Sequence, residues 1–173
     1  MDMAADLGVS HVESGHRRGT PEFRRVALAM FSAGLATFTT LYCVQAMLPA
    51  LATQYRLTPA EASLAVSVST AALAVGVIPL TALSEAVGRT RVMTAALFTS
   101  AVLGILAAIS PTFGVLLVLR GLQGLALAGL QATAMSYLAE ELDRGSLGAA
   151  MGLFIAGNGI GGMSGRLLGA LLG

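Results

Sequence analysis

The fold is decided by residues 92–139, which read VMTAALFTSAVLGILAAISPTFGVLLVLRGLQGLALAGLQATAMSYLA. This stretch carries one charged residue, Arg120. As a single α-helix it would be roughly 72 Å long at about 1.5 Å per residue, more than twice the roughly 30 Å hydrocarbon core of a bilayer. It must therefore fold back, and the best turn is Ser110-Pro111-Thr112, because proline removes a backbone donor and suits the first position of a helix. The stretch predicts two membrane-spanning helices, near 92–109 and 113–138.

Long uncharged runs continue over the rest of the chain, at 26–55, 62–84 and 145–165. A spanning helix needs roughly 20 mostly apolar residues, and each run is long enough. Thr58 and Glu61 also form a capping-box pattern around Pro59, which is typical of a helix start. We therefore predict an all-α integral membrane protein with a polar tail over 1–25 and a membrane domain over 26–173. The three additional helices are expected near 26–49, 62–86 and 146–172.

The composition excludes several classes of protein. Of the 173 residues, 55% are hydrophobic and 11% are charged, and the mean hydropathy is +0.80. Soluble domains carry about 25% charged residues. The net charge of +1 gives no electrostatic footprint for nucleic acid, and one cysteine, Cys43, is too few for a disulfide framework or a cysteine metal site. We therefore expect the lipid bilayer as a partner, with no nucleic acid, no metal and no cofactor.

Arginine sets the predicted orientation, because the chain contains no lysine. On one side of the predicted membrane domain, the loops after the first and third helices contain a single arginine, Arg56. Positive charge accumulates on the cytoplasmic side of membrane proteins, so the N-terminus is predicted to be cytoplasmic. The seven arginines of that side precede the first helix or lie in the second and fourth loops: Arg17, Arg18, Arg24, Arg25, Arg89, Arg91 and Arg144.

The fourth predicted helix carries polar side chains on one arc. At about 100° per residue, Gln131 lies about 20° from Arg120, and Gln123 lies about 60° from it on the other side. An arginine inside a span is costly and by default faces protein or a water-filled path. These three residues are therefore candidates for a substrate or coupling pathway. Snorkelling of Arg120 to the nearer interface is the alternative, but it does not explain the two glutamines.

The first and fifth predicted helices have their own distinctive faces. Tyr42 and Gln45 share one face of the first helix, which suits a lining that hydrogen-bonds a polar solute, although Gln45 fits an amide bridge between helices equally well. Arg166 lies in the fifth span and is explained equally by snorkelling and by function. Small residues spaced by four let another helix approach closely. The glycines of the fifth helix expected to serve this packing are Gly148, Gly157, Gly161 and Gly165.

Three motifs resemble those of the major facilitator superfamily of secondary transporters. Residues 120–124, RGLQG, resemble the R-x-x-Q-G signature of the family's fourth helix, and residues 81–91, TALSEAVGRTR, resemble its loop 2–3 signature. The four fifth-helix glycines match those of the antiporter signature. Tyr42, Gln45, Leu48 and Pro49 resemble the end of helix 1 in drug- and sugar-efflux members. The resemblance extends from about residue 24 to the end of the chain.

The chain departs from the family pattern at several positions. Glu85 stands where the loop 2–3 signature has aspartate, while Gly162 and Arg166 replace the proline and the last glycine of the antiporter signature. The resemblance implies that the loop acts in the conformational change through Glu85, Gly88, Arg89 and Arg91. A negative charge also suits a helix N-terminus. Glu85 alternatively pairs with Arg89 four residues later on the same helix.

The resemblance implies proton-coupled efflux of a small solute through the inner membrane, with Asn158 added to the pathway candidates. Family members usually have twelve helices in two halves. This chain is therefore expected to be an incomplete N-terminal half, a truncated portion that needs a missing C-terminal half or partner helices and does not transport alone. The alternative is a non-transporting five-helix module that assembles with a partner through its glycine-rich fifth helix. An enzyme is not expected, because the spans hold no nucleophile–base or metal constellation.

Overall fold

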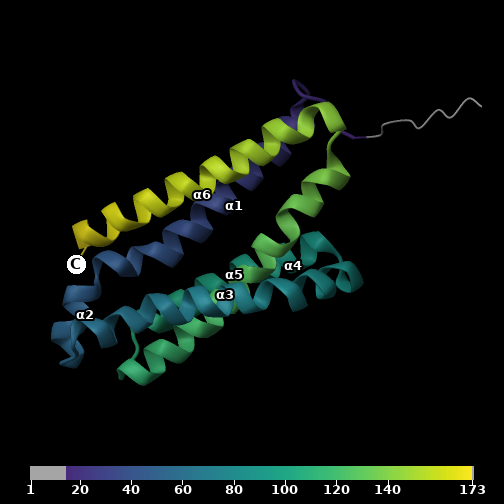
Figure 1. The fold of residues 1–173 in the computed structure, drawn as a ribbon. Helices are drawn as coiled ribbons and strands as arrows, with labels where there is room; N and C mark the ends of the chain where they lie inside the picture. Colours follow the sequence, from purple (N-terminus) through teal and green to yellow (C-terminus); the bar gives the residue numbers. More distant parts are fainter. Residues whose placement is uncertain (1–14, 173) are drawn as a thin grey trace, which may run out of the picture.

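A computed structural model describes residues 15–172, and this part of the chain is a bundle of six α-helices (Figure 1). Five of them are long and apolar enough to cross a membrane, and the exception is the short α2. The expected all-α membrane architecture with five spans is confirmed. The helices are α1 (Pro21–Ala46), α2 (Leu48–Tyr55), α3 (Pro59–Val87), α4 (Arg89–Ala108), α5 (Phe113–Glu141) and α6 (Arg144–Leu172).

The helix ends follow local sequence signals. The Thr58 side chain accepts a hydrogen bond from the backbone N–H of Glu61, and the Glu61 carboxylate accepts one from the backbone N–H of Thr58, so the capping box opens α3. Gly88 separates α3 from α4 with φ of 104°, a conformation that favours glycine. The expected reversal at residues 110–112 is also present, and Thr112 caps α5 by accepting a hydrogen bond from Val115.

The first span differs from its expected bounds of 26–49 at both ends. It begins at Pro21, because Thr20 caps the helix and proline fits its first position. It then breaks at Met47, and a separate helix starts at Leu48, next to Pro49, which has no backbone N–H to continue the ladder. Residues 1–14, with most of the expected polar tail, lie outside the described residues.

Two close helix pairs organise the bundle: α1 lies along α6, and α3 lies along α5, with α4 packed on α5 (Figure 1). Four glycines of α6 meet the backbone of α1, and we call them the glycine stripe. A Cβ at any of them would overlap or crowd that backbone. The contacts join Gly157 to Phe31, Gly161 to Leu35, Gly165 to Thr39 and Gly169 to Cys43. Residue numbers increase in the same direction along both helices, so α1 and α6 run parallel, with their backbones in contact.

Gly148 differs from the other glycines expected to serve packing. A Cβ at this position would meet no atom within 4 Å. Among the described residues, Gly148 therefore has no helix packed on it, and its packing role stays a prediction. Many large apolar side chains are likewise exposed, among them Ile78 at 79% and Phe98 at 72%. Such exposure is tolerated where the solvent is lipid.

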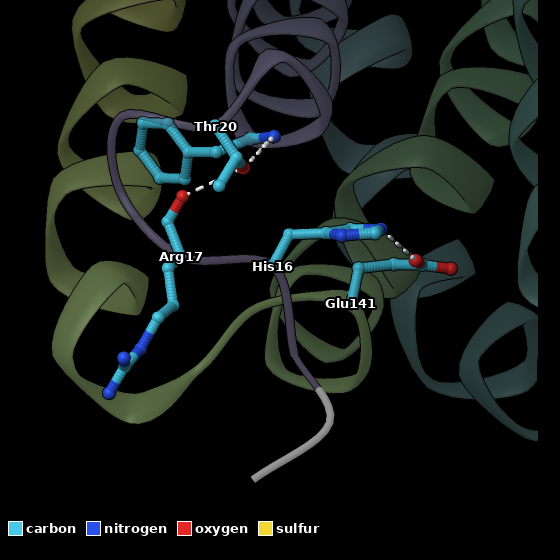
Figure 2. A network of polar contacts seen from close by, with 5 residues as sticks. His16, Arg17, Thr20 and Glu141 are labelled. Carbon is cyan, nitrogen blue, oxygen red and sulfur yellow. Dashed lines mark hydrogen bonds and ion pairs between the residues drawn. The ribbon is translucent and has the colours of Figure 1, made fainter.

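An N-terminal strap, residues 15–20, lies against the junction of α5 and α6 (Figure 2). The backbone N–H of His16 donates to the Glu141 carbonyl at 2.8 Å, and the N–H of Arg18 donates to the Ser146 hydroxyl at 2.6 Å. The imidazole of His16 also lies 3.9 Å from the Glu141 carboxylate. The last residues before α1 are therefore attached to the bundle, whereas the sequence analysis placed them in the polar tail.

We expect Gly15→Val to detach this strap. A Cβ at Gly15 would overlap the backbone of Leu142 and Asp143, so the strap must shift and lose its hydrogen bonds. At about 0.5–1.5 kcal/mol per bond, losing two bonds raises the detached population about tenfold or more. Trypsin should then cleave after Arg17 and Arg18 about tenfold faster. Gly148→Val, in open space, is the control, and equal cleavage rates in the two variants would contradict the assignment.

Candidate functional site

Arg120 is buried in the centre of the bundle, with only 3% of its surface exposed. Its Nε donates to the carbonyl of Ala65 on α3 at 3.3 Å. One terminal nitrogen donates to the Thr40 carbonyl at 3.3 Å and to Oε1 of Gln123 at 2.6 Å, and the other donates to the Leu41 carbonyl at 2.9 Å. The guanidinium therefore joins α5 to α1 and α3 through backbone acceptors, and it does not extend toward a helix end.

Gln123 extends this network to a fourth helix. Its Nε2 donates to the carbonyl of Ser100 on α4 at 3.0 Å, and the side chain is 1% exposed. The next residue, Gly124, lies directly on the backbone of Ser69, which brings α5 close enough to α3 for the bonds of Arg120. We call Arg120 and Gln123 the Arg120 clamp. Within residues 15–172, no carboxylate lies within ion-pair distance of this arginine.

A cavity of about 250 Å³ lies beside the clamp, between α1, α2, α4 and α5. Arg120 and Gln123 form part of its wall, together with Cys43 and Tyr55. The Tyr55 hydroxyl donates to the Ser110 carbonyl at 2.9 Å and so ties α2 to the turn before α5. The cavity is mainly apolar, with the clamp as its charged side.

A second polar group lies across the seam between α1 and α6, and we call it the Arg166 cluster. Nε of Arg166 donates to Oε1 of Gln45 at 2.8 Å. The guanidinium carbon stands 5.2 Å from the centre of the Tyr42 ring, and the Phe38 ring lies 5.7 Å from that ring. Gln45 therefore links α1 to α6 through its bond with Arg166. This contact agrees with the interpretation of Gln45 as an amide bridge between helices.

Gln131 and Asn158 belong to neither group. Nε2 of Gln131 and Oδ1 of Asn158 are buried and have no hydrogen-bond partner among the described residues. A Cβ placed on Gly34 would stand 2.5 Å from the Asn158 oxygen, so this amide is turned toward α1. Buried polar atoms without a partner are uncommon in folded proteins and mark positions where a further group can bind.

The loop between α3 and α4 forms a third set of candidates. Arg89 pairs with Glu140 of α5 at 2.9 Å, so the alternative pair between Glu85 and Arg89 is not formed. Glu85 is exposed and makes no ion pair with any described residue. Arg91 lies at one side of an apolar groove of about 580 Å³ between α3, α4 and α5. The four loop residues are near one another in sequence but have different surroundings.

Several contacts of the candidate site have little or no signal in the sequence. The acceptors of Arg120 are backbone carbonyls of Thr40, Leu41 and Ala65, which carry no sequence signal. The partner of Arg89, Glu140, had a weak signal as an acid at a helix end. Among the described residues, no group of three His, Cys, Asp or Glu side chains is placed to hold a metal ion.

Five apolar spans and buried polar clusters define this chain as an α-helical multi-pass membrane protein. Residues 27–173 match the family model of the Major Facilitator Superfamily, and the chain belongs to that family.

The chain is similar to several curated proteins of this kind. It is 49% identical over 88% of its length to the inner membrane transport protein YnfM of Escherichia coli, covering 36% of that protein. It is 48% identical over 90% of its length to the uncharacterized MFS-type transporter YybF of Bacillus subtilis, covering 39%. A probable 4-methylmuconolactone transporter of Cupriavidus pinatubonensis is 28% identical over 84% of the chain, which covers 34% of that protein. The chain thus spans little more than a third of the length of these relatives. No solved structure matches it.

The alternative of a non-transporting module receives no support from these findings. That hypothesis needs the glycine face of α6 to be free for a partner. Instead, Gly157, Gly161 and Gly165 all lie against the backbone of α1 in the same chain. The close approach that the glycine spacing predicts is satisfied internally.

Proposed function

We propose that this chain forms part of a transporter that carries a small solute out of the cell through the inner membrane, coupled to protons. The observation that carries the proposal is the family match over residues 27–173. The relative in Escherichia coli is named as an inner membrane transport protein, which supports the location. The chain itself acts as a conduit, with no enzymatic step.

The proposed substrate pathway runs along polar residues beside the seam of α1 and α6 and extends to Gln131 on α5. Tyr42 and Gln45 supply its aromatic and amide groups, and Asn158 and Gln131 supply buried polar atoms that no described residue satisfies. In this proposal the Arg120 clamp fixes the position of α1, since its donors are occupied by backbone carbonyls and by Gln123. It therefore acts on the pathway through α1.

The proposed orientation places the N-terminus in the cytoplasm. The start of α1, the α3–α4 loop and the α5–α6 junction carry most of the arginines, and Arg56 is on the other side. Positive charge prefers cytoplasmic loops. In this orientation, the ion pair of Arg89 with Glu140 lies at the cytoplasmic end, where we propose that the loop residues Glu85, Gly88 and Arg91 take part in the conformational change.

Proton coupling requires a group that titrates. The acidic residues of the described part lie near helix ends, among them Glu61, Glu85 and Glu140. We therefore propose that the coupling carboxylate comes from outside these five spans, and that the chain supplies solute contacts and a moving helix pair. The relatives are much longer than this chain, which leaves room for such a group.

A chimera tests the proposal, with the chain replacing the matching segment of the Escherichia coli relative. In everted membrane vesicles holding a pH gradient, we expect at least one compound from a panel of neutral, anionic and cationic solutes to dissipate the gradient. The matching Arg120→Leu chimera, which lacks the clamp, should lose this response. Solute movement without proton movement would overturn the coupling, and no response to any compound would overturn efflux by this mechanism. The 173-residue chain alone should give no response.

A further inference from the structure

We propose that the Arg166 cluster binds the carboxylate of the transported solute, so that the substrate is an organic anion. This inference rests on the proposed function and specifies its substrate class. The cluster consists of Arg166 on α6 and of Gln45, Tyr42 and Phe38 on α1. Gly162 of α6 lies next to the Tyr42 ring. The cluster lies on the seam that the proposed pathway follows.

Arg166 is exposed on α6, and its guanidinium makes two contacts with α1 but no ion pair with a described residue. A guanidinium has five N–H donors in a planar fork. The Nε donor is taken by Gln45, and the ring of Tyr42 supports the charge from one side. The two terminal nitrogens donate to no acceptor among residues 15–172, although they form the edge that suits a bidentate carboxylate. The two contacts on α1 therefore orient the fork and leave its binding edge free.

Within residues 15–172, no acidic side chain pairs with this charge. The ion pairs of the described residues are those of His16 with Glu141 and of Arg89 with Glu140, and neither includes Arg166. An arginine within a span needs a partner, since a charge there is costly. Snorkelling alone would leave the head group free to follow the interface, whereas here it is fixed by Gln45 and Tyr42. A bound anion supplies the missing partner.

A second arginine makes the surrounding field positive at the same depth. Arg120 donates to the carbonyl of Thr40, and Gly165, next to Arg166, lies against the backbone of Thr39. The two guanidinium groups thus flank the same turn of α1. Four hydrogen bonds to protein acceptors engage Arg120. Arg166 is therefore the group that contacts the anion, and Arg120 raises the local potential.

Two aromatic side chains give the cluster an apolar surface next to the guanidinium. A Cβ at Gly162 would stand 3.4 Å from the Tyr42 ring, so the ring lies close over α6 at this point. The Phe38 ring is tilted against Tyr42 and extends the aromatic surface by one turn of α1. A small carboxylate with an aromatic or unsaturated body matches this combination of a cationic fork and an adjoining aromatic surface.

Binding measurements with a matched set of probes test the proposal. The full chain is placed in nanodiscs of phosphatidylcholine and titrated calorimetrically with benzoate, benzyl alcohol and benzylamine. We expect benzoate to bind and the neutral and cationic analogues to bind at least about tenfold more weakly. Arg166→Gln should weaken benzoate binding about 10-fold to 100-fold, the range expected for charged hydrogen bonds, while Arg166→Lys recovers part of the affinity. Arg56→Gln, which removes the same charge outside the bundle, should change nothing.

Other outcomes would overturn the proposal. Equal binding of the three probes, or an equal loss in the Arg166→Gln and Arg56→Gln variants, would show that the cluster does not select a carboxylate. Benzoate binding that is absent in phosphatidylcholine, together with an Arg166-dependent enrichment of phosphatidylglycerol around the chain, would assign the arginine to lipid. The binding assay does not depend on transport. If the chimera transports only neutral or cationic solutes and the chain binds no anion, this inference fails and the proposed function stands. Anion binding without any chimera transport defeats the proposed function alone.

Discussion

Arg120→Leu is expected to lower the free energy of unfolding by about 2–4 kcal/mol. Hydrogen bonds to charged groups contribute roughly 1.5–3 kcal/mol each in soluble proteins, whereas bonds between membrane helices average about 0.6 kcal/mol. The four bonds of Arg120 reach α1, α3 and Gln123. Together they give about 2.4 kcal/mol at the membrane value and about 6 kcal/mol or more at the soluble value, and we expect a loss near the membrane value. The substitution also leaves Oε1 of Gln123 buried without its donor. Reversible unfolding in mixed dodecylmaltoside and dodecyl sulfate micelles measures the change.

Two further variants separate geometry from charge. Arg120→Lys keeps the charge but replaces the planar fork with a compact ammonium of three donors. It cannot reach all four acceptors, and it should be nearly as destabilising as leucine. Arg166→Leu removes the same residue type at the same depth, but from a position with one protein hydrogen bond, and should cost less than about 1 kcal/mol. Equal losses in Arg120→Leu and Arg166→Leu, or a fully stable Arg120→Lys, would contradict the assigned role of the clamp.

The architecture was predictable where a local signal coincides with a helix end. The capping box at Thr58 and the break at Gly88 each combine a backbone preference with nearby charged residues. The reversal at Pro111 combines proline with an apolar run too long for one span, and the structure contains all three. The break at Met47 was not predicted, because apolar residues continue through it and only Pro49 marks the change. The strap was not predicted either, because its bonds start from main-chain N–H groups of His16 and Arg18, which carry no sequence signal.

The contacts of the candidate site were also predictable only in part. The polar arc of Arg120 and Gln123 follows from helical periodicity, and the two side chains do contact each other. Their other partners are backbone carbonyl oxygens. Every residue has such an oxygen, so the sequence does not indicate which ones accept these bonds. Arg166 and Gln45 are far apart in the chain, and their contact depends on the register between α1 and α6. That register results from the glycine stripe, whose spacing predicts close approach but does not name the partner helix.

The glycine stripe therefore provides the second large effect. Gly161→Leu is expected to lower the free energy of unfolding by about 3 kcal/mol, at the upper end of the range for overpacking. A Cβ at this position would overlap the carbonyl oxygen of Leu35, which is rigid backbone and cannot rotate away. The two helices must separate, and the hydrogen bond from the Thr39 hydroxyl to the Gly161 carbonyl, 3.1 Å long, would be lost with the contact. Unfolding in the same mixed micelles measures the loss.

Gly159→Leu is the matched control, because it makes the same change on the same helix at a position with no atom within 4 Å. Replacing glycine in a helix gains roughly 0.8–1 kcal/mol of propensity, so this variant should be unchanged or slightly more stable. Opposite changes in the free energy of unfolding at Gly159 and Gly161 would show that Gly161 is required by its backbone contact with α1. They would exclude a general requirement for glycine in α6. The same separation would move Tyr42 and Gln45 away from Arg166, so Gly161→Leu should also abolish benzoate binding while Gly159→Leu retains it. Equal destabilisation by both substitutions would mean that α6 does not pack on α1 in the way the structure shows.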